Sequence, residues 1–142
     1  MDDLLTIGKQ ALASQPFSVL LGAELLYFSQ GRAEIKVPIR PELKQQHGFV
    51  HGGVISYAAD NGLTFAGGSV LGPDVVTSEF KINYLRPAMG DFLVAKATVV
   101  YSSKSQAVCR CDVFMSEGGK ESLCATSQGT ISKLPEMPGS KN

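Results

Sequence analysis

The segment over residues 52–68 constrains the fold more than any other part of this chain. It reads GGVISYAADNGLTFAGG and, at helical spacing, carries apolar or small side chains on nearly every side. A helix of that kind is expected to be buried on every side, so the rest of the chain must surround it. Small residues along this helix would let the backbone of neighbouring elements approach it closely. The pair Gly67 and Gly68 predicts the C-terminal end of the helix.

The remaining sequence alternates apolar and polar residues, which is typical of half-buried strands. A short amphipathic helix over residues 2–13 comes first, with Asp2 and Asp3 in its first turn, and one further turn follows Pro16 over residues 17–21. Short polar or glycine-containing connections predict antiparallel hairpins. The predicted strands cover residues 24–28, 32–39, 79–84, 93–101, 107–115 and 123–131. This order predicts an α+β fold with a curled antiparallel sheet wrapped around one long central helix.

Length and charge narrow the classes of protein that are compatible with the chain. Its 142 residues suit one domain, which we place over residues 1–134, with a disordered C-terminal tail over 135–142. Thirteen basic residues balance thirteen acidic ones, which argues against a nucleic-acid partner. No apolar run approaches the roughly 20 residues that a membrane span needs, and the acidic start is unlike a secretory signal. We therefore expect a cytoplasmic protein with no membrane or nucleic-acid partner.

The cysteines and histidines do not predict a metal site. All three cysteines, Cys109, Cys111 and Cys124, are interpreted as reduced thiols. Cys109 and Cys111 lie in an alternating apolar run and are therefore interpreted as buried core residues. His47 and His51 stand four residues apart, a spacing that can bind zinc on a helix. Here, however, the segment is predicted to be a loop and no third ligand is near in sequence.

The start of the central helix is the first candidate for chemistry. Gly52 and Gly53 fall in its first turn, where backbone N–H groups lack partners within the helix and the helix dipole is positive. Such N–H groups can stabilise a developing negative charge, as in an oxyanion hole. His51 could fix the loop or polarise a substrate carbonyl. The alternative is that two glycines simply form a tight turn from loop to helix.

Asp60 is the second candidate, because a carboxylate inside a buried helix is costly without a reason. One reason is a role as general base or nucleophile, and the alternative is a structural carboxylate bonded to the hydroxyl of Ser56 or Thr64. Eight residues separate Asp60 from Gly52, about 12 Å along one helix. That offset suggests that the two groups meet across a dimer of antiparallel helices.

Two motifs carry a family resemblance. The first is His51-Gly52-Gly53 with Asp60-Asn61-Gly62 after it, and the second runs from Thr77 through Phe80-Lys81-Ile82-Asn83-Tyr84-Leu85-Arg86-Pro87-Ala88. Together they resemble the PaaI-like branch of the hot-dog thioesterases, over about residues 45–131. The resemblance implies a hot-dog fold, dimers that often pair into tetramers, and hydrolysis of acyl-coenzyme A thioesters. Coenzyme A would be part of the substrate, and no separate cofactor is implied.

The same resemblance implies roles for individual residues. Asp60 matches the catalytic carboxylate and Gly52 the N–H that polarises the thioester carbonyl. Gln45 falls where the family has Asn or Gln near the attacking water or the carbonyl, although many PaaI-like members have Asn there. Further matches are Thr64 for placing water, Thr77 for lining the acyl pocket, His51 and Gly53 at the helix start, and Arg86 and Lys104 for the coenzyme A phosphates.

Two other functions remain open from the sequence. One is a hot-dog enoyl-coenzyme A hydratase or dehydratase, which would use an active-site histidine with a different loop pattern. The other is a non-catalytic protein that binds acyl-coenzyme A. The His51-Gly52-Gly53 start with Asp60 favours hydrolysis over the first, and retention of Gly52, Asp60 and Thr64 argues against the second. The sequence does not specify the acyl group.

Overall fold

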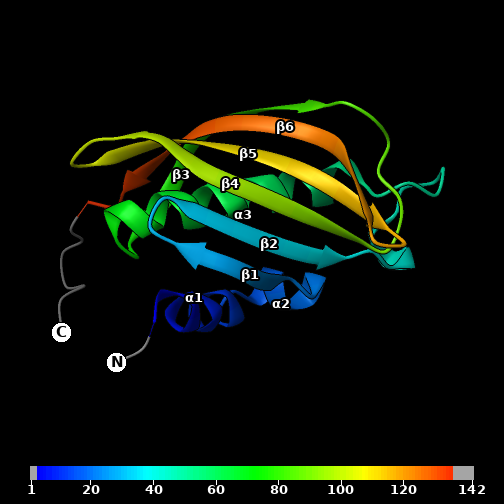
Figure 1. The fold of residues 1–142 in the computed structure, drawn as a ribbon, viewed down its shortest axis with the longest axis horizontal. Coiled ribbons are helices and arrows are strands. Elements are labelled where there is room, and N and C mark those ends of the chain that lie inside the picture. Colours follow the sequence, from blue (N-terminus) through cyan, green and yellow to red (C-terminus); the bar gives the residue numbers. More distant parts are fainter. Residues whose placement is uncertain (1–2, 136–142) are drawn as a thin grey trace.

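The computed structural model describes residues 3–135 as three helices, one 3₁₀ turn and six strands. The chain begins with two short helices and a hairpin, continues through the long helix, and ends with four strands (Figure 1). The elements are α1 (Leu4–Ala13), α2 (Pro16–Leu21), β1 (Glu24–Ser29), β2 (Arg32–Pro38), η1 (Pro41–Leu43), α3 (Gly52–Leu71), β3 (Val75–Tyr84), β4 (Phe92–Ser102), β5 (Gln106–Glu117) and β6 (Lys120–Lys133).

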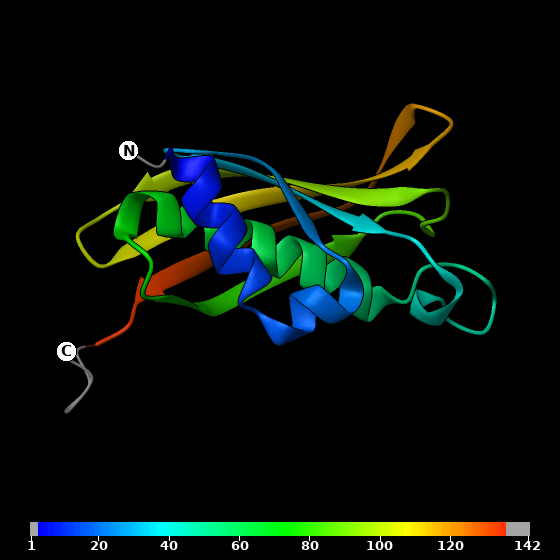
Figure 2. The same ribbon diagram turned by 90° about the horizontal axis from the view of Figure 1, so that it is seen from below.

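The six strands form one antiparallel sheet in the order β1-β2-β4-β5-β6-β3. The sheet curls over α3, and α1 and α2 lie beyond β1, as the two views in Figures 1 and 2 show. The predicted architecture, an antiparallel sheet wrapped around a long helix, is therefore confirmed. The inner side chains of the strands make a single hydrophobic core with α3, whose fully buried members include Ile35, Leu63, Leu93 and Ile131.

The ends of the helices differ from the sequence prediction. Helix α3 continues three residues past Gly68 and stops at Gly72, whose φ of 103° suits glycine. Gly67 and Gly68 keep helical backbone, because a glycine ends a helix only where the chain turns to positive φ. At the other end of the chain, Asp3 is the N-cap of α1 and accepts from the Thr6 N–H at 2.7 Å, while Asp2 lies outside the described residues.

The prediction that α3 is buried on every side is wrong for the single chain. The sheet covers only part of its circumference, because a sheet packs against one side of a helix. A stripe along the remaining side stays wholly or partly exposed, and we call it the open stripe. Its members are Gly53, Ser56, Asp60, Thr64 and Gly68.

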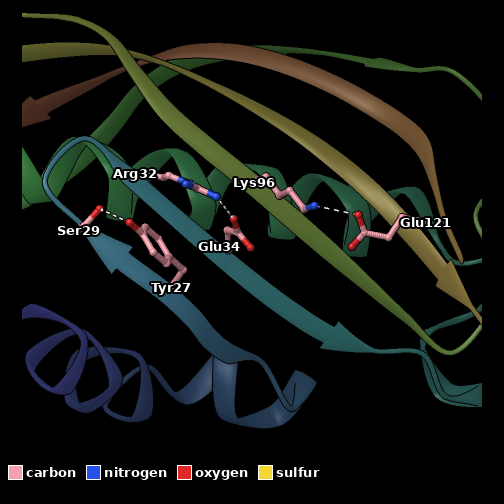
Figure 3. A network of polar contacts seen from close by, with 6 residues as sticks. All are labelled: Tyr27, Ser29, Arg32, Glu34, Lys96 and Glu121. Atoms are coloured by element: carbon pink, nitrogen blue, oxygen red, sulfur yellow. Dashed lines mark hydrogen bonds and ion pairs between the residues drawn. The ribbon is translucent and has the colours of Figure 1, made fainter. Parts of the chain in front are cut away.

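The outer face of the sheet carries charged and polar side chains. Figure 3 shows three contacts there: Arg32 with Glu34 at 2.7 Å, Lys96 with Glu121 at 2.8 Å, and the Ser29 hydroxyl donating to Tyr27. Exposed ion pairs of this kind contribute little to stability. The stability of the sheet therefore comes from its inner face against α3, and the outer face keeps charged groups in water.

Two other expectations concern the ends of the chain and the membrane. The predicted disorder over residues 135–142 falls, apart from Pro135, outside the described residues. No helix within residues 3–135 combines the length and the apolar character needed to cross a bilayer.

Candidate active site

The first turn of α3 presents one free backbone donor. His51 is the N-cap, and its side-chain Nδ1 accepts from the Gly53 N–H at 2.8 Å. The His51 carbonyl accepts from the Val54 N–H at 2.9 Å. Within residues 3–135 the Gly52 N–H has no acceptor, so Gly52 keeps the donor that points out of the positive end of the helix. Of the two glycines singled out by the sequence, Gly53 has its N–H occupied by the cap.

A pocket of about 380 Å³ opens beside this turn, and we call it the Gly52 pocket. Its walls are mostly apolar and come from the loop before α3, the start of α3, the last residue of β3 and the segment that follows β3. The lining residues are Gln45, Phe49, Val50, Gly52, Ile55, Tyr84, Leu85, Arg86, Pro87 and Ala88. A small apolar pocket with few polar groups is typical of a ligand site, and here the polar groups include two residues predicted from the sequence, Gln45 and Arg86.

The loop before α3 fixes the side chain of Gln45. Its Oε1 accepts from the backbone N–H groups of His47 at 2.6 Å and Phe49 at 3.3 Å. The Gln45 N–H in turn donates to the Phe49 carbonyl at 2.8 Å, which closes the loop on itself. Because the amide oxygen is used by the loop, the NH₂ group is what Gln45 can offer to a ligand.

Tyr84 is a site residue that the sequence reasoning treated only as part of a strand motif. Its hydroxyl donates to the Gly52 carbonyl at 3.2 Å and lies 2.5 Å from the Ser56 hydroxyl, so it covers the first turn of α3. The alternation in β3 puts Tyr84 on the same face as Phe80 and Ile82, which pack against the core. That alternation was the signal that could have placed Tyr84 against the helix.

Asp60 forms a second group of polar side chains, the Asp60 cluster, with Thr64 and Thr77. The Thr77 hydroxyl donates to Asp60 Oδ1 at 2.5 Å, and the Thr64 hydroxyl donates to the Asp60 backbone carbonyl at 2.8 Å. The two threonine hydroxyls are 3.0 Å apart. Asp60 is partly exposed rather than buried. Its carboxylate bonds to neither Ser56 nor Thr64, the two partners that the structural alternative predicted, because β3 brings Thr77 to it instead.

One chain does not bring all the predicted residues together. Gly52 and Asp60 lie on one helix, eight residues and about 12 Å apart, so the Gly52 pocket and the Asp60 cluster are separate. Arg86 lines the Gly52 pocket. Lys104 lies in the turn between β4 and β5, at the end of the sheet opposite to the Gly52 pocket (Figure 1). In the same turn the Ser105 carbonyl accepts from the backbone N–H of Lys133 near the end of β6.

The three cysteines are free and buried in the core, as the sequence predicted for Cys109 and Cys111. Burial raises the pKa of Cys109 and of Cys124 to about 11, and it also raises the pKa of Cys111. Thiols of this kind are poor nucleophiles and poor metal ligands at neutral pH. Within residues 3–135 no three His, Cys, Asp or Glu side chains gather closely enough to hold a metal ion.

Comparison with known proteins decides the family. The sequence profile of the Thioesterase superfamily matches residues 47–122, a range that includes the start of α3, Asp60, Thr77 and Arg86. The chain belongs to the thioesterase superfamily. The resemblance to PaaI-like hot-dog thioesterases is thereby confirmed, and the fold described above is the hot-dog fold of this superfamily.

Solved structures of other members agree with this assignment. A thioesterase family protein from Silicibacter pomeroyi is 33% identical, with a TM-score of 0.84 over 88% of this chain and 93% of that one. A thioesterase from Haemophilus influenzae is 28% identical, with a TM-score of 0.80 over 94% and 92% of the two chains. A mutant of the phenylacetic acid degradation protein PaaI from Thermus thermophilus is 30% identical, with a TM-score of 0.74 over 84% and 100%.

Proposed function

We propose that this thioesterase hydrolyses acyl-coenzyme A thioesters to the free acid and coenzyme A. The observation that carries the proposal is the partly exposed Asp60 carboxylate on the open stripe, held through one oxygen by Thr77. A carboxylate fixed in this way, with its second oxygen free of partners among residues 3–135, suits attack on a carbonyl carbon or activation of water. The free Gly52 N–H supplies the matching electrophilic group.

In the proposed reaction the thioester carbonyl accepts from the Gly52 N–H, at the positive end of α3. Asp60 takes a proton from water while the water oxygen bonds to the carbonyl carbon. The tetrahedral intermediate then collapses, the carbon–sulfur bond breaks, and the departing thiolate takes the proton back from Asp60. In the alternative route Asp60 itself attacks, releases the thiolate and forms a mixed anhydride that water hydrolyses.

The separation of Gly52 from Asp60 supports a shared site. We propose a homodimer in which Asp60 of one chain meets Gly52 of the other, and in which dimers pair again into tetramers. The open stripe is made largely of small residues, and β3 is an edge strand of the sheet with much of its surface exposed. Both features suit a self-complementary interface around a two-fold axis.

Coenzyme A binding is assigned to the end of the molecule that carries the Gly52 pocket. The Arg86 guanidinium lines this pocket from the exposed segment after β3, and we propose that it pairs with a phosphate. Gln45 would donate its NH₂ group to the carbonyl or to water. Lys104 is too far from this pocket within one chain, so it could serve the same site only from a second chain. The protein is proposed to act in the cytoplasm.

Replacement of Asp60 tests the proposal. Thiol release from a panel of aliphatic and aromatic acyl-coenzyme A thioesters identifies the best substrate, and Asp60→Asn is then expected to lower kcat by roughly a hundredfold or more. Asp74→Asn is the matched control, because Asp74 is exposed at the far end of α3 and the change in charge is the same. Light scattering should show an unchanged oligomer for both variants.

Near-native turnover by Asp60→Asn would make Asp60 a structural residue and the mechanism wrong.

The same panel of thioesters distinguishes hydrolysis from the two rival functions. Loss of the conjugated absorbance of an enoyl-coenzyme A, without release of thiol, would indicate a hydratase. Saturable binding without any reaction would indicate a non-catalytic acyl-coenzyme A binding protein.

A further inference from the structure

Helix α2 is short, and it exposes an unusual amount of apolar surface for its length. Of its six residues, Phe17 is 57% exposed, Val19 61% and Leu20 64%. A helix of six residues is not stable by itself in water. Contacts with the rest of the chain must therefore hold α2 in position. These contacts join it to α3 and to Arg40.

A connected polar network joins α2 to α3. The Tyr57 hydroxyl donates to Ser18 Oγ at 2.6 Å, and the Ser18 hydroxyl donates to Gln15 Oε1 at 2.5 Å. The Asn61 NH₂ group lies within 3.0–3.3 Å of acceptors on Gln15, Ser18 and Tyr57. Ser18 and Asn61 are buried. A buried network in which every member has a partner fixes the geometry of the groups that it joins.

The far end of α2 is fixed as well. The Arg40 guanidinium donates to the last two carbonyls of the helix, at 2.6 Å to Leu20 and 3.1 Å to Leu21. A cation at the C-terminal end of a helix also stabilises the helix dipole. Helix α2 is thus held at both ends, with Leu21 in the core and with Phe17, Val19 and Leu20 facing out.

The network places an aromatic pair beside Asp60. The ring centroids of Phe17 and Tyr57 are 5.4 Å apart, with an edge-to-face angle of 83°. Tyr57 precedes Asp60 by three residues, so the two side chains are neighbours on the surface of α3. Figure 2 shows α2 lying side by side with the N-terminal half of α3. Phe17 and Tyr57 therefore border the open stripe on one flank, and Thr77 of β3 borders it on the other.

We infer that Phe17, held in place by Tyr57, contacts the acyl group of the substrate and selects thioesters whose apolar acyl group is long enough to reach α2. The inference rests on the proposed function. In that reaction the carbonyl carbon lies beside Asp60, and coenzyme A extends toward Arg86. The acyl group must leave the carbonyl in another direction, along the open stripe. Whichever chain supplies Asp60 also supplies Tyr57 on the same helix, and with it Phe17.

The test compares chain-length profiles. The kcat/KM values are measured for straight-chain acyl-coenzyme A thioesters from acetyl to dodecanoyl, with wild type, Phe17→Ala and Val19→Ala. Phe17→Ala is expected to lower kcat/KM about tenfold for the longest substrates, mainly through KM, and to leave acetyl-coenzyme A within about twofold. Phe17→Leu, which keeps an apolar side chain, should lie between wild type and Phe17→Ala.

Val19→Ala is the matched control, because Val19 is as exposed as Phe17 but lies about 200° around the same helix. It should reproduce the wild-type profile. Thermal unfolding and light scattering establish that each variant keeps its fold and its oligomeric mass.

Several results would overturn the inference. They are an unchanged profile for Phe17→Ala, an equal loss for every chain length, or a smaller oligomer, which would make Phe17 a contact between subunits. A wild-type protein that releases no thiol from any straight-chain substrate would defeat the inference, and one that also releases none from the aromatic thioesters of the panel would defeat the proposed function as well. An active wild type with an unaltered Phe17→Ala profile would defeat the inference alone.

Discussion

At the scale of single residues, Thr77 determines how the Asp60 carboxylate is held. Its hydroxyl reaches Asp60 Oδ1 from β3, while the hydroxyl of Thr64, one turn further along α3, bonds to the Asp60 backbone carbonyl rather than to the carboxylate. The resemblance gave Thr77 a place in the lining of the acyl pocket. The observed hydrogen bond adds a positioning role, because a carboxylate with a fixed rotamer presents its second oxygen in one direction.

Thr77→Val tests this role at constant side-chain volume. Valine removes the donor to Asp60 and keeps the shape, so we expect kcat to fall about tenfold, with a smaller change in KM. Thr126→Val is the control, since Thr126 donates to Asp112 at 2.6 Å on the outer face of the sheet. That variant loses the same kind of hydrogen bond and should keep kcat. Equal values of kcat for the two variants would remove Thr77 from the mechanism.

At the scale of the element, the glycines of α3 determine how closely the sheet approaches it. A Cβ added at Gly67 would lie 2.6–2.8 Å from three atoms of Ile131, a fully buried residue of β6. A Cβ added at Gly68 would meet only Val75, at 3.6 Å. The two neighbouring glycines therefore have different reasons to be glycine. Packing against the sheet requires glycine at position 67, whereas Gly68 lies on the open stripe, where a Cβ would fit.

Alanine at each position separates these roles. Gly67→Ala gains about 1 kcal/mol of helix propensity, but it overpacks the core by roughly 1–3 kcal/mol, so the free energy of unfolding should fall. Gly68→Ala keeps the gain without the clash and should raise the free energy of unfolding by about 0.5–1 kcal/mol. Urea titration followed by circular dichroism measures both. If the free energy of unfolding changed by the same amount and in the same direction in both variants, Ile131 would have to move aside without cost.

At the scale of the whole molecule, a single chain keeps the Gly52 pocket and the Asp60 cluster apart. The Gly52 pocket lies at the N-terminal end of α3, and the Asp60 cluster lies two turns along the same helix. In the proposed dimer, two antiparallel copies of α3 would complete two identical sites, each with Gly52 from one chain and Asp60 from the other.

Complementation between inactive variants tests the shared site. Asp60→Ala removes the carboxylate, and Gly52→Pro removes the N–H at the first position of α3, where proline is tolerated. The residue before it, His51, already has the extended backbone that proline requires, with φ −61° and ψ 137°. A mixed dimer contains one doubly altered site and one intact site.

Each variant by itself should be nearly inactive. After the two are mixed, unfolded and refolded together, random pairing makes half of the dimers mixed, so activity should recover to roughly a quarter of wild type. Refolded wild type is the control for yield, and mass spectrometry verifies the exchange of chains. No recovery in a verified mixture would mean that each site lies within one chain.

The sequence by itself determined the features that depend on local periodicity. Alternation located the strands, the all-round apolar character of residues 52–68 located the central helix, and the helix start identified Gly52 as a donor. The two motifs identified the superfamily. These conclusions held because a strand or helix reveals its period within a few residues, and a free N–H follows from being first in a helix.

The tertiary structure decided what depends on partners distant in the sequence. Only the register of β3 against α3 shows that Thr77, 17 residues from Asp60, is the partner of the carboxylate. Only the one-sided cover by the sheet shows that Asp60 lies on an open stripe. The positions of Tyr84 over the first turn and of Phe17 beside Tyr57 likewise depend on packing between separate elements. Hydrophobic periodicity shows that a face is apolar, and packing decides which residue covers it.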